Sequence, residues 1–251
     1  MKPFVSVILP NYNELENLKR GVLLSIYKYL NGQKFSWEVI ISDDGSTDAS
    51  INFIEKFIKV HPGFKFLKNP HAGKPFALAS ALKAARGEYV LFTDMDQSTP
   101  INQLEKLIPY TKDGFKVVIG SRGIRRRDSS LLRQLASVIF LLARKIFLLR
   151  NIKDTQCGFK LLQADLARNI FSRMRLFGRS SQSVGWKVTA YDVEMLFLAE
   201  KLGQEIQEVR VVWQDEDTSS GKKRNFIKES VEMFTEILRV SVNDMLGKYN
   251  V

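Results

Sequence analysis

Two aspartates separated by one residue are the clearest candidates for chemistry in this chain. Asp94 and Asp96 flank Met95, directly after an apolar run of strand length. In an extended backbone alternate side chains point the same way, so a turn here could bring both carboxylates near one cation. Hard oxygen ligands suit Mg²⁺ or Mn²⁺, which would bridge to a diphosphate and offset the charge of a departing nucleotide. Acidic pairs in turns are more often solvated or capping, and the position at a strand exit is what favours a metal.

A second acidic pair, Asp43 and Asp44, also follows an apolar run. These side chains could accept hydrogen bonds from a base or a ribose, as acidic residues at strand ends do in other nucleotide folds. They fit a turn at Gly45 followed by a helix cap equally well, and both interpretations can hold. Gly73 and Lys74 precede a helical segment and offer backbone amides and a cation to an anion. Neither a Walker loop nor a G-x-G-x-x-G motif is present, which argues against ATPases and dehydrogenases.

The elements that must position these residues alternate in type. Short apolar runs and longer helical patterns follow one another, as in βα units around a largely parallel sheet, where ligands sit beyond the carboxyl ends of the strands. The expected strands are Phe4–Leu9, Trp37–Asp43, Phe64–Leu67, Glu88–Thr93, Phe115–Gly120 and Glu208–Trp213. The expected helices are Glu14–Leu30, Asp48–Val60, Pro75–Ala85, Ile101–Thr111 and an amphipathic one from about Asn225 to Leu246. The fold class is therefore predicted to be α/β.

Composition limits the domain organisation and the partners. With 251 residues and 45% hydrophobic content, the chain can form one domain over residues 1–251. A soft boundary near residue 121 separates a nucleotide-binding half, 1–120, from a half for the second substrate, 121–251. A single cysteine, Cys157, excludes an intrachain disulfide and predicts a cytosolic compartment, and we expect no signal sequence. The net charge of +11 predicts attraction to a polyanion, whether nucleic acid, anionic lipid or a phosphorylated substrate.

The longest apolar segment, Leu131 to Leu149, contains charged residues, so we expect no transmembrane helix. On a helix, Arg133, Ser137 and Arg144 would share a narrow polar stripe, and most of the remaining circumference would be apolar. Such a helix could be a buried core element or could lie in the headgroup layer of a membrane, and both remain open. Flanking arginines contribute about 1 kcal/mol each at an anionic surface, and these are Arg125, Arg126, Arg127 and Arg150.

The order of the motifs resembles that of a known enzyme family. Pro10-Asn11-Tyr12-Asn13-Glu14, then Asp43-Asp44-Gly45-Ser46-Thr47-Asp48, then Gly73-Lys74, then Asp94-Met95-Asp96 is similar to the family 2 glycosyltransferases. The second half resembles the polyprenyl-phosphate glycosyltransferases, and most closely their dolichyl-phosphate glucosyltransferase branch. That likeness rests on Gly120-Ser121-Arg122, on Arg133 with Ser137, on Asp154-Thr155-Gln156-Cys157-Gly158-Phe159-Lys160, and on Trp186 before Tyr191-Asp192-Val193-Glu194. Pro75 departs from the family, which usually has a second glycine there, and the transmembrane segment of many relatives is missing.

The resemblance implies the GT-A fold, a Rossmann-like and mostly parallel sheet flanked by helices, here with amphipathic C-terminal additions. It implies metal-dependent, inverting transfer of a hexose to a polyprenyl phosphate. A UDP-sugar, with glucose as the sugar, is the favoured donor, and a GDP-sugar stays open. The enzyme would act peripherally at the cytoplasmic face of a membrane. A membrane-protein partner or a second copy of the chain could assist it.

The resemblance also assigns roles to residues. The donor nucleoside would lie at Pro10, Asn11, Glu14, Asp43 and Asp44, and the metal and diphosphate at Asp94 and Asp96, with Met95 between them and Gln97 able to join. Gly73 and Lys74 would face the donor phosphates. Lys222 and Lys223 would close over the diphosphate, and Arg122, Arg133 and Ser137 would lie toward the acceptor phosphate.

The need for a general base depends on the acceptor. A lipid monophosphate has a second pKa of about 6 and is largely a dianion near neutral pH, so it needs no base. Arg122 and Arg133, with the metal, would then hold two phosphates together. Asp154 is the candidate for a base or for orienting the acceptor, and it fits a capping or salt-bridging role nearly as well. Asp192 and Glu194 are reserves for the base.

Two alternatives belong to other acceptors or classes. A family 2 transferase acting on a saccharide hydroxyl, as in cell-surface polysaccharide assembly, would need Asp192 or Glu194 as its base. A basic nucleic-acid-binding module would account for the charge. It is disfavoured because the basic runs lack interleaved aromatic residues and no recognised binding motif is present.

Overall fold

One seven-stranded sheet forms the centre of the computed structural model, with strand order β3-β2-β1-β4-β6-β5-β7. The structure describes residues 2–123, 152–178, 191–214, 216 and 226–249, and for 226–233 it describes the backbone alone. Strands β1 to β4 are parallel, as are β5 and β7, whereas β6 runs antiparallel to both its neighbours. The strands are Val5–Asn11 (β1), Trp37–Asp43 (β2), Phe64–Lys68 (β3), Tyr89–Phe92 (β4), Val117–Ser121 (β5), Lys160–Gln163 (β6) and Ile206–Arg210 (β7).

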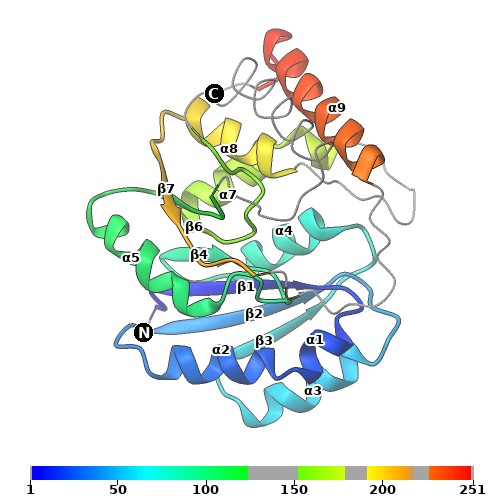
Figure 1. The fold of residues 1–251 in the computed structure, drawn as a ribbon, viewed down its shortest axis with the longest axis vertical. Coiled ribbons are helices and arrows are strands. Elements are labelled where there is room, and N and C mark those ends of the chain that lie inside the picture. Colours follow the sequence, from blue (N-terminus) through cyan, green and yellow to red (C-terminus); the bar gives the residue numbers. More distant parts are fainter. Residues whose placement is uncertain (1, 124–151, 179–190, 215, 217–225, 250–251) are drawn as a thin grey trace.

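Helices cover both faces of this sheet (Figure 1). Alternate residues of β1 enter different cores: Val7 and Leu9 pack toward α1, α2, α3 and α5, and Ile8 packs toward α4, α7 and α8. Because the central strands are apolar on both faces, they are covered by helices on both, as parallel sheets are. The helices are Leu15–Lys19 (α1), Val22–Asn31 (α2), Ser50–Val60 (α3), Lys74–Ala84 (α4), Leu104–Lys112 (α5), Ala164–Arg173 (α7), Tyr191–Lys201 (α8) and Phe226–Met245 (α9). Short 3₁₀ turns lie at Ile101–Gln103 (η1) and Arg175–Gly178 (η2). The predicted α/β class with a mostly parallel sheet is confirmed.

The predicted elements are confirmed with shifted ends, apart from one helix and one strand. The single helix expected over 14–30 is wrong, because the chain breaks at Gly21, whose φ of +83° is left-handed, into α1 and α2. Strand β6 was not predicted. The last strand ends at Arg210 rather than at Trp213. The segment 131–149 lies outside the described residues.

The C-terminal helix α9 packs on α8 through one face. Ile237 and Val240 are buried there, and just beyond the helix the Tyr249 hydroxyl donates to Glu194 Oε1 at 2.7 Å. Away from that contact the helix also exposes large apolar side chains; they are Phe234, Leu238, Val242 and Met245. Within the described ranges, no helix is long and apolar enough to cross a membrane.

Candidate active site

The polar strand exits meet at one edge of the sheet. Asn11 at the end of β1 is paired in register with Asp43 at the end of β2. On the other side of β1, Ile8 is paired with Phe92, so Asp94 follows two residues beyond that point. Parallel strands bring their carboxyl ends to the same edge, and the candidate residues of three motifs are therefore neighbours.

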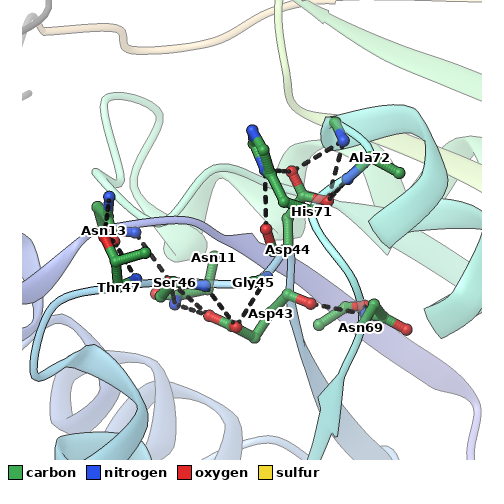
Figure 2. A network of polar contacts seen from close by, with 12 residues as sticks. Asn11, Asn13, Asp43, Asp44, Gly45, Ser46, Thr47, Asn69, His71 and Ala72 are labelled. Carbon is green, nitrogen blue, oxygen red and sulfur yellow. Dashed lines mark hydrogen bonds and ion pairs between the residues drawn. The ribbon is translucent and has the colours of Figure 1, made fainter. Parts of the chain in front are cut away.

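The carboxylate of Asp43 accepts hydrogen bonds from the loop that follows it (Figure 2). Oδ1 accepts from Asn11 Nδ2 at 2.6 Å and from Ser46 Oγ at 2.5 Å, and Oδ2 accepts from the amides of Gly45 and Ser46 at 3.0 and 2.9 Å. The side chain is almost completely buried. The turn-forming interpretation describes this geometry, and a direct contact of Asp43 with a nucleoside stays a prediction.

Asp44 holds the residues that lead into α4. Its Oδ1 accepts from the amides of Ala72 and Gly73, each at 2.9 Å, and His71 Nδ1 lies 2.9 Å from Oδ2. The amide of Gly73 thus donates to the protein's own carboxylate in this structure, and its contact with a donor phosphate stays a prediction. The His71 ring stacks on Tyr12, with centroids 4.3 Å apart and planes 14° apart. Sequence reasoning gave neither ring a role, because one histidine in a loop carries no pattern.

Asn13 links the loops that carry the first two motifs. It has a left-handed φ of +54°, and its Oδ1 accepts from the amides of Thr47 and Asp48 at 2.8 and 3.2 Å. The Glu14 amide donates to Ser50 Oγ at 3.1 Å. A non-glycine residue in this region is strained and is held there by its surroundings.

The three other predicted nucleoside residues also lie at this edge. Pro10 is half-buried near the end of β1. Glu14 Oε2 accepts from Asn17 Nδ2 at 2.6 Å. Asn11 is buried, and its Oδ1 has no hydrogen-bond partner among the described residues. A buried acceptor without a donor is costly, so a ligand N–H or O–H would satisfy it.

The D-x-D turn directs its two carboxylates away from the core. Met95 is buried among apolar residues, whereas Asp94 and Asp96 on either side are half-buried. Asp94 Oδ1 lies 2.5 Å from Lys74 Nζ, and Asp96 Oδ1 accepts from the Ser98 amide at 2.8 Å. Burial lowers the pKa of Lys74, but the carboxylates of Asp94 and Asp192 and the Tyr191 hydroxyl outweigh it and hold that pKa well above its usual value.

Gln97 completes the turn with a strained backbone. Its φ is +52°, and its Nε2 donates to the carbonyl oxygen of Asp94 at 2.8 Å. Its Oε1 is buried without a partner among the described residues. The unsatisfied oxygen and the strain lie beside the acidic pair, and a contact of Gln97 with a bound group stays a prediction.

The acidic pair fits a cation that is shared with a substrate. No cluster of three or more His, Cys, Asp or Glu side chains occurs in the parts of the chain that the structure describes. Mg²⁺ in phosphate-transferring sites is commonly held by one or two carboxylates, with substrate phosphates and water as its other ligands. Asp94 and Asp96 provide that donor set.

Gly158 brings the second half of the chain onto Asp94. A Cβ at this position would lie 2.1 Å from Asp94 Oδ2 and 2.8 Å from its Cγ. Only a residue without a side chain permits this approach. The 154–160 motif therefore contains a glycine because its loop packs directly against the D-x-D carboxylate.

Arg122 and Asp154 form an ion pair at the candidate site. The guanidinium contacts the carboxylate at two points, Nε to Oδ2 and Nη2 to Oδ1, both at 2.8 Å, and the Arg122 amide donates to Oδ2 at 2.9 Å. Burial raises the pKa of Asp154, but the bonds from Arg122 outweigh it and lower that pKa below its usual value. The Arg122 guanidinium carbon lies 5.7 Å from the centroid of the Trp213 ring. Trp213, which was expected only as a strand end, thus lies beside Arg122.

The two reserve carboxylates on α8 are both engaged within the protein. Asp192 Oδ1 lies 2.7 Å from Lys160 Nζ, and Lys160 is only 1% exposed. Burial, reinforced by Asp192, raises the pKa of Tyr191 far above its usual value. Glu194 accepts from the Arg175 amide and from Tyr249, each at 2.7 Å, and so ties α8 to the C-terminus.

Four predicted site residues, Arg133, Ser137, Lys222 and Lys223, lie outside the described residues. Gln214, a described residue that precedes these lysines, lies beside the D-x-D turn. There the Gln214 amide donates to the carbonyl oxygen of Ser98 at 2.8 Å, and Glu216 Oε2 lies 2.6 Å from Arg20 Nη2.

Several solved structures have a similar fold. Mannosyl-3-phosphoglycerate synthase from Rubrobacter xylanophilus matches with a TM-score of 0.68 at 17% identity, over 99% of this chain and 76% of that one. Glucosyl-3-phosphoglycerate synthase from Mycobacterium tuberculosis, in complex with UDP, matches with a TM-score of 0.63 at 18% identity, over 96% and 80%. A mannosyltransferase from Pyrobaculum calidifontis, in complex with GDP-Man and Mn²⁺, matches with a TM-score of 0.60 at 18% identity, over 95% and 65%. The expected GT-A fold is confirmed.

Curated proteins with similar sequences match this chain over nearly its whole length. A dolichyl-phosphate beta-glucosyltransferase from Dictyostelium discoideum is 33% identical over 99% of this chain and 77% of its own length. A dolichyl-phosphate beta-glucosyltransferase from Saccharomyces cerevisiae is 30% identical over 98% and 76%. The sequence profile described as Glycosyl transferase family 2 matches residues 6–171. The chain belongs to glycosyl transferase family 2.

Proposed function

We propose that this enzyme transfers glucose from UDP-glucose to dolichyl phosphate or a similar polyprenyl phosphate, with inversion at the anomeric carbon. The observation that carries the proposal is the 33% identity to a dolichyl-phosphate beta-glucosyltransferase across 99% of the chain. In the reaction an acceptor phosphate oxygen forms a bond to C1 of the sugar. The bond from C1 to the diphosphate oxygen breaks, and its electron pair leaves with the nucleoside diphosphate.

The donor side of the site is assigned to the strand exits of β1, β2 and β4. Asn11 Oδ1, buried without a partner among the described residues, would accept a hydrogen bond from the nucleoside. Asp94 and Asp96 would hold Mg²⁺ or Mn²⁺, which when bound neutralises charge on the departing diphosphate. Lys74, with Lys222 and Lys223, would bind the phosphates of the same group. Asp43 and Asp44 act by fixing the loops that surround the nucleoside.

On the acceptor side, each of the three carboxylates considered as a general base is already engaged with another residue. Asp154 is held by Arg122, Asp192 is paired with Lys160, and Glu194 accepts from Tyr249. A carboxylate whose pKa is lowered by an arginine is a poor proton acceptor at neutral pH. A phosphate acceptor that is already a dianion needs no base, and this favours a lipid phosphate over a sugar hydroxyl. Asp154 then orients Arg122, which together with Arg133 and Ser137 would receive the acceptor phosphate.

The acceptor's lipid tail requires contact with a membrane. We propose that the protein binds peripherally to the cytoplasmic face through the segment 131–149 and its flanking arginines, with or without a membrane-protein partner. The net charge of +11 supports attraction to an anionic surface.

A donor panel tests the function. Purified full-length protein is incubated with Mn²⁺, dolichyl phosphate in detergent, and labelled UDP-glucose, UDP-galactose, UDP-N-acetylglucosamine or GDP-mannose. We expect labelled lipid from UDP-glucose, with a β linkage by NMR, and loss of the product when EDTA is added. A parallel panel replaces the lipid phosphate with dolichol and with oligosaccharides. Transfer to these hydroxyl acceptors alone, or transfer from no donor at all, would contradict the proposal.

A matched pair of variants assigns the activity to the site. Asp94→Asn removes a charge from the proposed metal site, and we expect turnover to fall by about 100-fold or more. Asp165→Asn removes the same charge from a side chain that is 84% exposed on α7, and it should leave turnover unchanged. If Asp94→Asn kept the turnover of the wild type, as Asp165→Asn should, the activity would not depend on Asp94.

A further inference from the structure

Asp94, one of the two proposed metal ligands, is already paired with a cation of the protein itself. Lys74 Nζ lies 2.5 Å from Oδ1, and the backbone of Gly158 covers Oδ2 closely. A divalent ion bound to Oδ1 at about 2.1 Å would enter the space next to the ammonium group, and the two positive charges would repel each other. A metal can therefore use this oxygen only if Lys74 moves away.

The position of Lys74 at the start of a helix is unfavourable for a positive charge. It is the first residue of α4, whose first turn contains no acidic residue, and the positive end of the helix dipole lies there. The preceding amides of Ala72 and Gly73 already hold the carboxylate of Asp44. Lys74 consequently depends on an anion from elsewhere, and in this structure the nearest such anion is Asp94.

The ammonium group has room to exchange partners. The side chains of Lys74 and Asp94 are 40% and 38% exposed, so neither is locked in the core. Nζ also lies 6.0 Å from the centroid of the Tyr191 ring, a cation–π distance that would partly stabilise the charge away from Asp94. A donor diphosphate arriving beside the D-x-D turn would offer oxygens within reach of the same side chain.

We propose that Lys74 competes with the divalent ion for Asp94 in the donor-free enzyme and moves to the diphosphate when the nucleotide binds. Metal and nucleotide then bind cooperatively, because the nucleotide removes the competitor of the metal. By linkage, the metal strengthens nucleotide binding by the same factor. The inference rests on the proposed function, since it needs a nucleotide donor and a metal at this site.

Binding of Mn²⁺ to the wild type and three variants, measured by electron paramagnetic resonance without and with saturating UDP, tests the proposal. Lys74→Met removes the charge and keeps the length of the side chain, and Lys74→Arg restores a charge. Lys68→Met is the matched control, because Lys68 forms an ion pair of the same 2.5 Å length with Glu55, outside the site.

We expect Lys74→Met to bind Mn²⁺ about five-fold more tightly than the wild type when UDP is absent, as loss of a half-exposed ion pair implies. With UDP present it should bind Mn²⁺ more weakly than the wild type, so the cooperativity between metal and nucleotide decreases. Lys74→Arg should recover cooperativity, and Lys68→Met should match the wild type.

The outcomes separate this inference from the proposed function. If Lys74→Met leaves Mn²⁺ binding without UDP unchanged or weaker, Lys74 does not compete for Asp94 and the inference is overturned, whatever the sugar and acceptor prove to be. If the wild type binds no Mn²⁺ even with UDP, the metal-assisted donor site fails and the inference fails with it. The donor panel can fail while the predicted Mn²⁺ pattern is still observed, which would change the substrates alone.

Discussion

At the scale of single residues, the carboxylates at the strand exits have two different kinds of partner. Asp43 accepts from two backbone amides of its own loop and from the side chains of Asn11 and Ser46, and Asp44 accepts from the amides of Ala72 and Gly73. Asp94 instead pairs with the side chain of Lys74, which is 40% exposed. Amide donors are fixed by the backbone, so we expect Asp43 and Asp44 to shape the donor site, whereas we propose that Asp94 exchanges its lysine partner for a ligand.

Asp154 should stabilise the fold through Arg122. Asp154→Asn leaves a buried guanidinium without its counter-ion, and we expect a loss of about 3 kcal/mol in the free energy of unfolding at pH 7, as for other broken buried pairs. Urea denaturation measures this loss. Asp165→Asn, on an exposed pair, should change the unfolding free energy by less than about 0.5 kcal/mol.

The same pair predicts a direction for pH dependence. The pKa of Asp154 is lower in the folded protein than in the unfolded chain. Its stabilisation is therefore complete above the unfolded value of about 3.9 and is lost as the pH falls through the folded pKa. The difference in unfolding free energy between the wild type and Asp154→Asn should be constant from pH 7 to about pH 5 and should shrink below about pH 4. A difference that grew on acidification would contradict the pairing.

Gly158→Ala should damage the metal site more than the fold. The added Cβ meets Asp94 Oδ2 at 2.1 Å, and the carboxylate must move out of position. We expect a fall in turnover of about 100-fold, in line with misplacement of a reacting group by about 1 Å, and weaker Mn²⁺ binding in the presence of UDP. Gly178→Ala is the control, since no heavy atom among the described residues lies within 4 Å of its added Cβ. Normal Mn²⁺ binding by Gly158→Ala would show that the contact with Asp94 is unimportant.

At the scale of elements, strand β6 joins the two halves of the chain. It lies between β4 and β5 and runs antiparallel to both, so a strand from beyond residue 121 completes the sheet of the donor half. It begins at Lys160, directly after the loop that carries Asp154 and Gly158. The acceptor-side loop is therefore fixed to the centre of the sheet, next to the D-x-D turn that follows β4.

The parallel strands were predictable from sequence because they are apolar runs bounded by polar residues, and the site motifs at their ends followed from that. Strand β6 was missed because Lys160 is a charged residue that is buried by pairing with Asp192, a partner distant in sequence. The break at Gly21 depended on a left-handed backbone, which a helical pattern does not reveal. The Asp44 contacts with Ala72 and Gly73 likewise join loops that only the folded sheet brings together.

The Lys160–Asp192 pair should couple β6 to α8 energetically. Each single substitution, Lys160→Met or Asp192→Asn, leaves a buried charge unpaired and should lower the free energy of unfolding by about 3 kcal/mol or more. The double variant should lose clearly less than the sum of the two losses. Urea denaturation of the four proteins measures the coupling, and additive losses would contradict it. Because Asp192 is proposed as structural, the double variant should keep measurable transfer to dolichyl phosphate, whereas a catalytic base at Asp192 would abolish it.

At the scale of the whole molecule, the net positive charge and the positions of the charged residues have different effects on binding. The net charge of +11 would attract any polyanion, lipid or nucleic acid, if it were spread evenly. The proposed membrane contact instead depends on arginines beside the apolar segment 131–149. Long-range attraction and local contact can be distinguished by removing equal charge from different places.

Vesicle binding provides that distinction. Replacing Arg125, Arg126 and Arg127 by glutamine should weaken binding to phosphatidylserine-containing vesicles by about 100-fold, from about 1 kcal/mol for each residue. Replacing three exposed lysines on α2 and α3, Lys28, Lys56 and Lys59, lowers the net charge equally and should weaken binding far less. Co-sedimentation at 50 and 300 mM salt measures both, and higher salt should weaken the wild type more than the arginine variant, since screening acts on the charges that touch the surface. Equal losses in the two triple variants would mean that net charge alone attracts the protein. Tighter binding to RNA than to vesicles, with a steep dependence on salt, would instead favour the nucleic-acid alternative.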